Sequence, residues 1–217
     1  MQKPLLKLCG NRSYEDFLLT SQSPADYLGF IFAKGKRQVQ PQEVKEWIGR
    51  HIPFSQKIVG VFVNPTNEEI AEVLNAVPLD VIQLHGNESI ERVEELTAAF
   101  DSCFWKALHH QADTVSKMSA YAPFVDGYII DTLIKGEWGG TGETFDWMSV
   151  PSYKKMAQKL NKICFIAGGI DADNVSNLLD LHPAGVDLSS GIEQNEKKDS
   201  AKLQLLIERM NKHVSIS

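Results

Sequence analysis

The chain has 217 residues, of which 43% are hydrophobic, and a formal net charge of −6 at pH 7. This length and composition suit one domain spanning residues 1–217, and the acidic balance without a basic run argues against a nucleic-acid partner. The apolar run after the first four residues is too short for a signal peptide or a membrane span, so we expect a cytoplasmic protein without a membrane partner.

Short apolar runs rich in β-forming residues recur along the chain, and a segment with helical periodicity follows each of them. This alternation is typical of repeated βα units around a parallel sheet. Eight runs are therefore predicted as strands. They cover residues 5–9, 27–32, 58–63, 81–85, 103–108, 127–131, 163–167 and 186–189.

Two of the helical segments carry clear boundary signals. Thr66, with Glu69 three residues later, forms a capping box before an apolar stripe at helical spacing. Near the end of the chain, Asp199 is placed to cap a second helix with its own stripe. The two predicted buried stripes are Ile70, Val73, Leu74 and Val77, and Leu203, Leu206, Ile207 and Met210.

Eight βα units in 217 residues predict an α/β fold, a (β/α)₈ TIM barrel with short loops. A doubly wound open sheet is the alternative. The first predicted strand leads into Gly10-Asn11-Arg12 and lacks the GxGxxG turn of a dinucleotide crevice, which favours the barrel. No Pro- or Ser-rich linker interrupts the alternation, so we place no domain boundary.

Three ionisable residues, Cys9, His85 and Asp131, end predicted strands, at the rim where barrel enzymes place their catalytic groups, and Cys9 and Asp131 stand out as a possible base and acid. Cys9 ends the first strand, and Asp131 ends the sixth, three strands away around the ring. We expect the two side chains to face each other across the barrel mouth as a candidate base and acid. The alternatives are a small buried thiol and a carboxylate that caps a helix or tethers a loop.

Other polar residues lie on the inward faces of the predicted strands, near the same rim. Lys7 points the same way as Cys9, and its ammonium would lower the thiol pKa and raise the thiolate fraction. The alternative is that Lys7 pairs with an interior carboxylate for stability. Gln83 and His85 share a face of the fourth strand and could contact a ligand, although an inward histidine is more often a satisfied core residue.

Glycine-bearing segments follow the sixth, seventh and eighth strands. The loops after strands 7 and 8 form the usual phosphate site of TIM barrels, because glycine lets backbone N–H groups approach the anion. Glycines also make ordinary turns, so their position carries the argument. The candidate phosphate ligands are Gly140, Thr141, Gly142, Gly168, Gly169, Ser189, Ser190 and Gly191.

The three cysteines, Cys9, Cys103 and Cys164, are widely scattered. None belongs to a CxxC pair or lies near a histidine at metal-ligand spacing. We expect reduced thiols and no metal site.

Short motifs in a fixed order run along almost the whole chain. They are Lys7-Leu8-Cys9-Gly10, Gly29-Phe30-Ile31-Phe32, Gly60-Val61-Phe62-Val63-Asn64, Gln83-Leu84-His85-Gly86, Gly139-Gly140-Thr141-Gly142, Ala167-Gly168-Gly169-Ile170 and Asp187-Leu188-Ser189-Ser190-Gly191-Ile192-Glu193. Together they resemble the phosphoribosylanthranilate isomerase family of tryptophan biosynthesis, whose members are (β/α)₈ barrels.

The resemblance implies an intramolecular oxidoreductase of the aldose–ketose isomerase type that needs no cofactor. Its reaction is the Amadori rearrangement of N-(5′-phosphoribosyl)anthranilate to 1-(2-carboxyphenylamino)-1-deoxyribulose 5-phosphate. Asp131 would protonate the ribose ring oxygen, and Cys9 would remove the C2′ proton. Near neutral pH this requires Asp131 to hold its proton and Cys9 to be partly thiolate. Arg37 would contact the anthranilate carboxylate or ring, and Asp187 would hold ribose hydroxyls.

Alternatives stay open beside the resemblance. Arg37 could be a solvated loop residue, and the chain could be a non-catalytic barrel that binds a sugar phosphate, although Cys9 together with Asp131 speaks against this. An indole-glycerol-phosphate synthase-like lyase would need lysines and glutamates at strand ends, where the second and third strands instead carry apolar residues. Asn11-Arg12 and Asn195-Glu196 depart from the family pattern and leave those loops undefined. The chain is expected to be a monomer or a homodimer.

Overall fold

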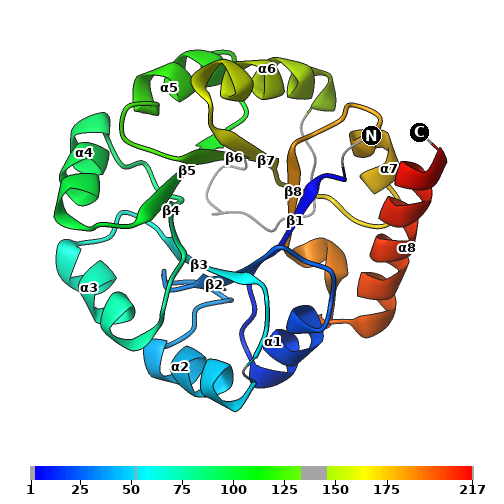
Figure 1. Cartoon of the computed structure of the whole chain (residues 1–217), viewed down its shortest axis with the longest axis horizontal. Coiled ribbons are helices and arrows are strands. Elements are labelled where there is room, and N and C mark those ends of the chain that lie inside the picture. Colours follow the sequence, from blue (N-terminus) through cyan, green and yellow to red (C-terminus); the bar gives the residue numbers. More distant parts are fainter. Residues whose placement is uncertain (1–2, 52, 133–145, 217) are drawn as a thin grey trace.

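The computed structural model describes residues 3–51, 53–132 and 146–216, with side chains described as far as residue 213. Eight parallel strands pair in chain order, and the last pairs with the first to close a barrel that the helices surround (Figure 1). The predicted TIM barrel and its strands are confirmed, with strand ends within one residue of the prediction. The strands are β1 Leu5–Leu8, β2 Tyr27–Ile31, β3 Lys57–Phe62, β4 Val81–Leu84, β5 Cys103–His109, β6 Gly127–Asp131, β7 Ile163–Ile166 and β8 Gly185–Leu188.

Helices connect successive strands, and the last one completes the outer ring (Figure 1). The α-helices are α1 Tyr14–Ser21, α2 Pro41–Arg50, α3 Asn67–Ala76, α4 Ile90–Ala99, α5 Thr114–Tyr121, α6 Val150–Leu160, α7 Val175–Leu179 and α8 Ser200–Ile216. The 3₁₀ turns are η1 Trp147–Ser149 and η2 Ser190–Ile192, and a small hairpin of β9 Glu193–Gln194 and β10 Lys197–Lys198 precedes α8. In the part of the chain that the structure describes, no helix has the length and apolar character needed to cross a membrane.

Both predicted helix starts are confirmed. At α3, Thr66 Oγ1 accepts from Glu69 N at 3.2 Å, and Glu69 Oε2 accepts from Thr66 N at 2.8 Å. At α8, Asp199 Oδ1 accepts from Lys202 N at 2.9 Å. These bonds satisfy N–H groups that have no partner inside the helix. The apolar stripes pack inward as expected, with Leu74 and Ile207 only partly buried.

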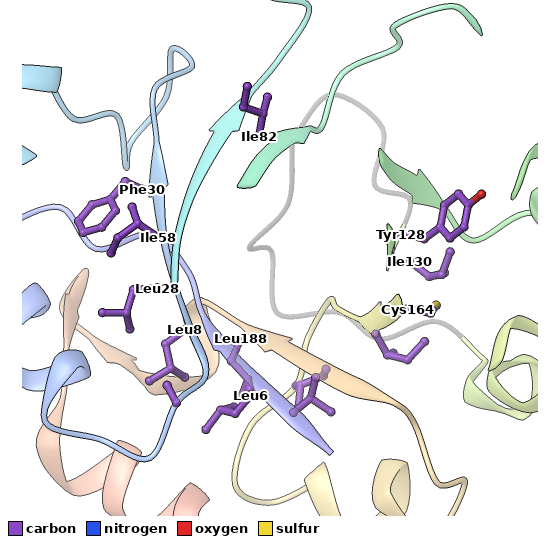
Figure 2. Close-up of a cluster of buried hydrophobic side chains, with 14 of the residues drawn as sticks. Leu6, Leu8, Leu28, Phe30, Ile58, Ile82, Tyr128, Ile130, Cys164 and Leu188 are labelled. Carbon is purple, nitrogen blue, oxygen red and sulfur yellow. The ribbon is translucent and has the colours of Figure 1, made fainter. Parts of the chain in front are cut away.

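The strands bury both faces, as parallel strands with covering helices do. Leu6 and Leu8 of β1 face the helices, in the outer cluster that Figure 2 shows. Cys9 belongs to the inner cluster that fills the barrel. The alternation predicted for the first strand is therefore confirmed. The buried inner residues are Cys9, Tyr27, Val59, Val61, Val81, Trp105, Ala107, Ile129, Phe165 and Ala167.

Three aspartates fix the rim opposite the strand C-termini. Asp26 accepts from Leu6 N at 2.8 Å, Asp80 from Ile58 N at 2.7 Å, and Asp126 from Phe104 N at 2.9 Å. Each aspartate directly precedes an even-numbered strand and binds the start of the strand before it. This rim is thus tied together by structural carboxylates.

Candidate active site

A pocket of about 630 Å³ opens at the C-terminal ends of the strands, a volume suited to a small organic ligand. Ends of strands and the loops that follow β2, β7 and β8 line it. Ten of the residues predicted from the sequence meet here. They are Cys9, Arg37, Gln83, His85, Asp131, Gly168, Gly169, Asp187, Ser189 and Ser190.

Of the remaining predicted residues, Lys7 and Gly191 are not part of the described pocket lining. Lys7 lies beneath it with a fully buried side chain, and its Nζ is 2.7 Å from Asp187 Oδ2. Gly191 packs the two glycine loops together, because a Cβ there would collide with the carbonyl oxygen of Ile170. Gly140, Thr141 and Gly142 lie outside the described residues.

Cys9 directly follows β1, and its residue surface is 7% exposed. Its sulfur lies against Gly29, where an added Cβ would approach Sγ to 2.6 Å. Burial raises the pKa of the Cys9 thiol above its ordinary value and outweighs the lowering effect of the Lys7 ammonium. Lys7 by itself lowers the thiol pKa, as predicted from the sequence, but burial is the larger effect. Asp187, which is paired with Lys7, raises the thiol pKa further.

A chain of polar contacts orients Asp131. Its Oδ1 accepts from the backbone N of Thr132 at 2.7 Å, and its Oδ2 lies 3.3 Å from His85 Nε2. On the other side of the ring, His85 Nδ1 is 3.0 Å from Gln83 Nε2. With the Gln83 amide donating to Nδ1, Nε2 is the ring nitrogen left to carry a proton, and it lies near Asp131 without a hydrogen bond to it in the described residues.

Arg37 lies in an ion cluster after β2 and β8. Its Nε and Nη2 donate to the two carboxylate oxygens of Glu193 at 2.9 and 2.6 Å, and Lys198 Nζ donates to Glu193 Oε1 at 2.9 Å. The Arg37 side chain is 19% exposed, so the alternative of a solvated loop arginine is not what the structure has. Burial alone would raise the pKa of Glu193, but the hydrogen bonds and charges of Arg37 and Lys198 lower it to about 2.

The sequence reasoning gave no role to Glu193 or Lys198. These residues pair across the β9–β10 hairpin, whose turn residues Asn195 and Glu196 have φ of 48° and 61°. Two successive positive φ values are typical of the tight hairpin turn that matches strand twist. Opposite charges at the two ends of such a turn are the signal that could have identified the pair.

We expect the ion cluster of Arg37, Glu193 and Lys198 to become less stabilising in acid. The folded-state pKa lies below the ordinary 4.5, so the stabilisation is fully present above about pH 4.5 and is lost as pH falls toward 2. We expect Glu193→Gln to lower the free energy of unfolding at neutral pH and to flatten its fall in acid, measured by urea unfolding across this range. Glu196→Gln, at an exposed carboxylate of the same turn, is the matched control. Equal acid sensitivity in wild type and Glu193→Gln would contradict the assignment.

Several buried polar atoms of the pocket lining have no hydrogen-bond partner within the described segments. They include Gln83 Oε1, Asp187 Oδ1 and Ser189 Oγ. Gly168 and Gly169, with φ of 89° and 62°, follow β7 at the same rim. Buried polar groups are normally satisfied, so these atoms indicate a polar ligand. No group of three or more His, Cys, Asp or Glu residues is placed to hold a metal ion in the described ranges.

A closed parallel barrel whose C-terminal rim gathers a thiol, a carboxylate and glycine loops defines an enzyme of the (β/α)₈ class. The model of one family, described as N-(5′-phosphoribosyl)anthranilate (PRA) isomerase, matches residues 6–209. The chain belongs to this family and is an isomerase.

Individual relatives agree with the family match. The N-(5′-phosphoribosyl)anthranilate isomerase of Bacillus velezensis is 52% identical over 217 residues, which cover 100% of both chains. The crystal structure of the Thermotoga maritima isomerase is 30% identical with a TM-score of 0.83, covering 96% of this chain and 99% of that one. A third structure, an isomerase in complex with reduced 1-(o-carboxyphenylamino)-1-deoxyribulose 5-phosphate, is 29% identical with a TM-score of 0.80 and the same coverage.

Proposed function

We propose that the pocket catalyses the Amadori rearrangement of N-(5′-phosphoribosyl)anthranilate to 1-(2-carboxyphenylamino)-1-deoxyribulose 5-phosphate, a step of tryptophan biosynthesis. The enzyme is then an intramolecular oxidoreductase of the aldose–ketose type. The observation that carries the proposal is that Cys9 and Asp131, from β1 and β6, line one pocket. A substrate between them meets a base and an acid from different strands.

The reaction divides into two proton transfers. Asp131 gives its proton to the ribose ring oxygen, the bond from that oxygen to C1′ breaks, and a Schiff base with the anthranilate nitrogen forms. Cys9 then takes the C2′ proton, and the electron pair of that C–H bond produces an enolamine that tautomerises to the ketone. His85 Nε2, 3.3 Å from Asp131 Oδ2, is placed to stabilise the carboxylate that the first step leaves behind.

The remaining lining residues suit the two ends of this substrate. Gly168, Gly169, Ser189 and Ser190 offer backbone N–H groups and hydroxyls for the 5′-phosphate. Asp187 Oδ1, buried and unpartnered among the described residues, is an acceptor for a ribose hydroxyl. The ligand named in the third related structure carries both a carboxyphenylamino group and a 5-phosphate.

Arg37 is proposed to bind the anthranilate end. Its Nε and Nη2 are occupied by Glu193, so Nη1 and the planar faces of the guanidinium are the parts available to a ligand. We expect Arg37→Lys to raise KM roughly 10-fold or more with a smaller effect on kcat, because an ammonium lacks the forked donors that hold Glu193 and the planar faces that an aromatic ligand can use. Steady-state kinetics check this. Arg50→Lys, at an exposed arginine on α2, should match wild type, and an unchanged KM for Arg37→Lys would remove Arg37 from the binding site.

The reaction itself is tested with substrate generated in place, because the substrate is unstable. Anthranilate and phosphoribosyl pyrophosphate are combined by a phosphoribosyltransferase, and purified protein is added while the fluorescence of the aminated sugar is followed. Decay that depends on the protein concentration supports the proposal. No decay with folded protein would favour a barrel that only binds a sugar phosphate.

We also propose that residues 1–217 form one domain that works in the cytoplasm as a monomer or a homodimer. The related Thermotoga maritima enzyme is described as dimeric, with monomers generated from it. Sedimentation equilibrium of the purified chain distinguishes the two states.

A further inference from the structure

Lys198 is a buried lysine that the proposed reaction does not use directly. Its side chain is fully buried, and its Nζ donates to the backbone oxygen of Cys9 at 2.6 Å, to that of Ser189 at 3.1 Å and to Glu193 Oε1 at 2.9 Å. Its backbone N donates to Asp16 Oδ1 at 2.9 Å. Lys198 does not line the pocket, so it has no direct contact with a ligand there.

The three acceptors match the three hydrogen atoms of the ammonium group. A buried ammonium is costly unless it is paired and fully hydrogen-bonded, and here both conditions hold. Because every donor is used, the group has one favourable position. That position joins the end of β1 to the loop after β8 and, through Glu193, to Arg37.

We propose that Lys198 is a positioning residue of the active site, which fixes the backbone at Cys9 and the carboxylate that orients Arg37. Its role is to keep the base at a constant distance from the group that holds the aromatic end of the substrate. This inference rests on the proposed function, in which Cys9 is the base and Arg37 binds the anthranilate end of the substrate.

The charge of Lys198 also acts on the thiol. Burial raises the pKa of Cys9, Asp187 raises it further, and Lys7 and Lys198 lower it. Arg37, from the loop after β2, also interacts electrostatically with Cys9. Loss of the Lys198 ammonium should therefore leave Cys9 with a higher pKa, in addition to any displacement of its backbone.

Lys198→Met is the primary test, and Lys197→Met is its matched control because the neighbouring lysine is exposed on the same strand. We expect Lys198→Met to lower kcat/KM roughly 10- to 100-fold, as a small displacement of catalytic groups does, with kcat reduced and KM raised. Lys197→Met should keep wild-type kinetics. Lys198→Arg retains the charge and should recover part of the loss.

The second readout needs no substrate. Iodoacetamide alkylation of Cys9, followed by mass spectrometry of its peptide, gives the pH at which the thiol becomes half reactive. This pH should rise in Lys198→Met, rise less in Lys198→Arg and stay unchanged in Lys197→Met. Wild-type protein that alkylates as expected but fails to turn over the substrate would remove the proposed function. The alkylation midpoint of Lys198→Met would then decide whether Lys198 acts on the Cys9 thiol.

A folded Lys198→Met with wild-type kcat/KM and a wild-type alkylation profile would overturn the proposal. Should this variant fail to fold, as judged by circular dichroism, Lys198→Arg and Glu193→Gln decide instead. Glu193→Gln keeps the Lys198 bonds to Cys9 and Ser189, so it should raise KM without moving the alkylation profile upward. Wild-type KM in Glu193→Gln together with a wild-type thiol profile in Lys198→Arg would also overturn it.

Discussion

Asp131→Asn is expected to lower kcat of the isomerisation by about 10²- to 10⁴-fold, the range that one positioned proton donor contributes. The amide has nearly the shape of the carboxyl group and can still accept from the backbone N of Thr132, which Asp131 Oδ1 does at 2.7 Å. It cannot deliver a proton to the ring oxygen. The loss should therefore fall on kcat, measured by the decay of substrate fluorescence, and not on folding.

Ligand binding separates loss of chemistry from loss of the site. Reduced 1-(o-carboxyphenylamino)-1-deoxyribulose 5-phosphate, the compound bound to a related isomerase, should bind Asp131→Asn with a Kd near that of wild type. Asp126→Asn is the matched control, because Asp126 precedes the same strand at the opposite rim and accepts from Phe104 N. Its kcat should equal that of wild type. A folded Asp131→Asn enzyme that keeps near-normal turnover would exclude Asp131 as the acid.

The fold could be predicted because its signals are local. Each strand is a short apolar run, and the capping box at Thr66 and the cap at Asp199 depend on residues three apart. Strand ends were predicted to within one residue for the same reason. The aspartates of the N-terminal rim were not found, because Asp26 and Asp80 bind backbone groups of another strand and this requires the strand register.

The site was predictable where barrel geometry determines it. The C-terminal ends of parallel strands meet at one rim, so Cys9 and Asp131 could be paired without knowing any distance. The partner of Lys7 could not be chosen from the sequence. The register of β1 with β8, which places Lys7 opposite Asp187, identifies this partner.

Contacts made by the hairpin after β8 could not be predicted from the sequence. Glu193 and Lys198 act through a turn that brings them together and through backbone oxygens of distant residues, and no periodic pattern encodes such bonds. Burial is a second property that a sequence gives only on average, and it decides the direction of the Cys9 pKa. The phosphate role of Gly140, Thr141 and Gly142 stays a prediction, since these residues lie outside the described part of the chain.

Cys9→Ser is expected to lower kcat by about 10²- to 10⁴-fold, because a serine hydroxyl holds its proton far more tightly than a thiol and cannot accept the C2′ proton at neutral pH. The contact of Lys198 with this residue goes to the backbone oxygen of Cys9, so it survives the substitution. The fold and the affinity for reduced 1-(o-carboxyphenylamino)-1-deoxyribulose 5-phosphate should therefore stay close to those of wild type. Cys103→Ser, at the first residue of β5, is the control and should keep wild-type kcat.

The pH dependence makes this prediction sharper. In the proposed mechanism the thiolate is the active form of Cys9, and burial raises the thiol pKa, so deprotonation of Cys9 is expected to limit turnover near neutral pH. The value of kcat/KM for wild type and for Cys103→Ser should therefore climb as pH rises through the neutral and alkaline range, in parallel with alkylation of Cys9 by iodoacetamide. Turnover that stays level while alkylation climbs, or Cys9→Ser protein that works at near-normal rate, would mean that another group takes the C2′ proton.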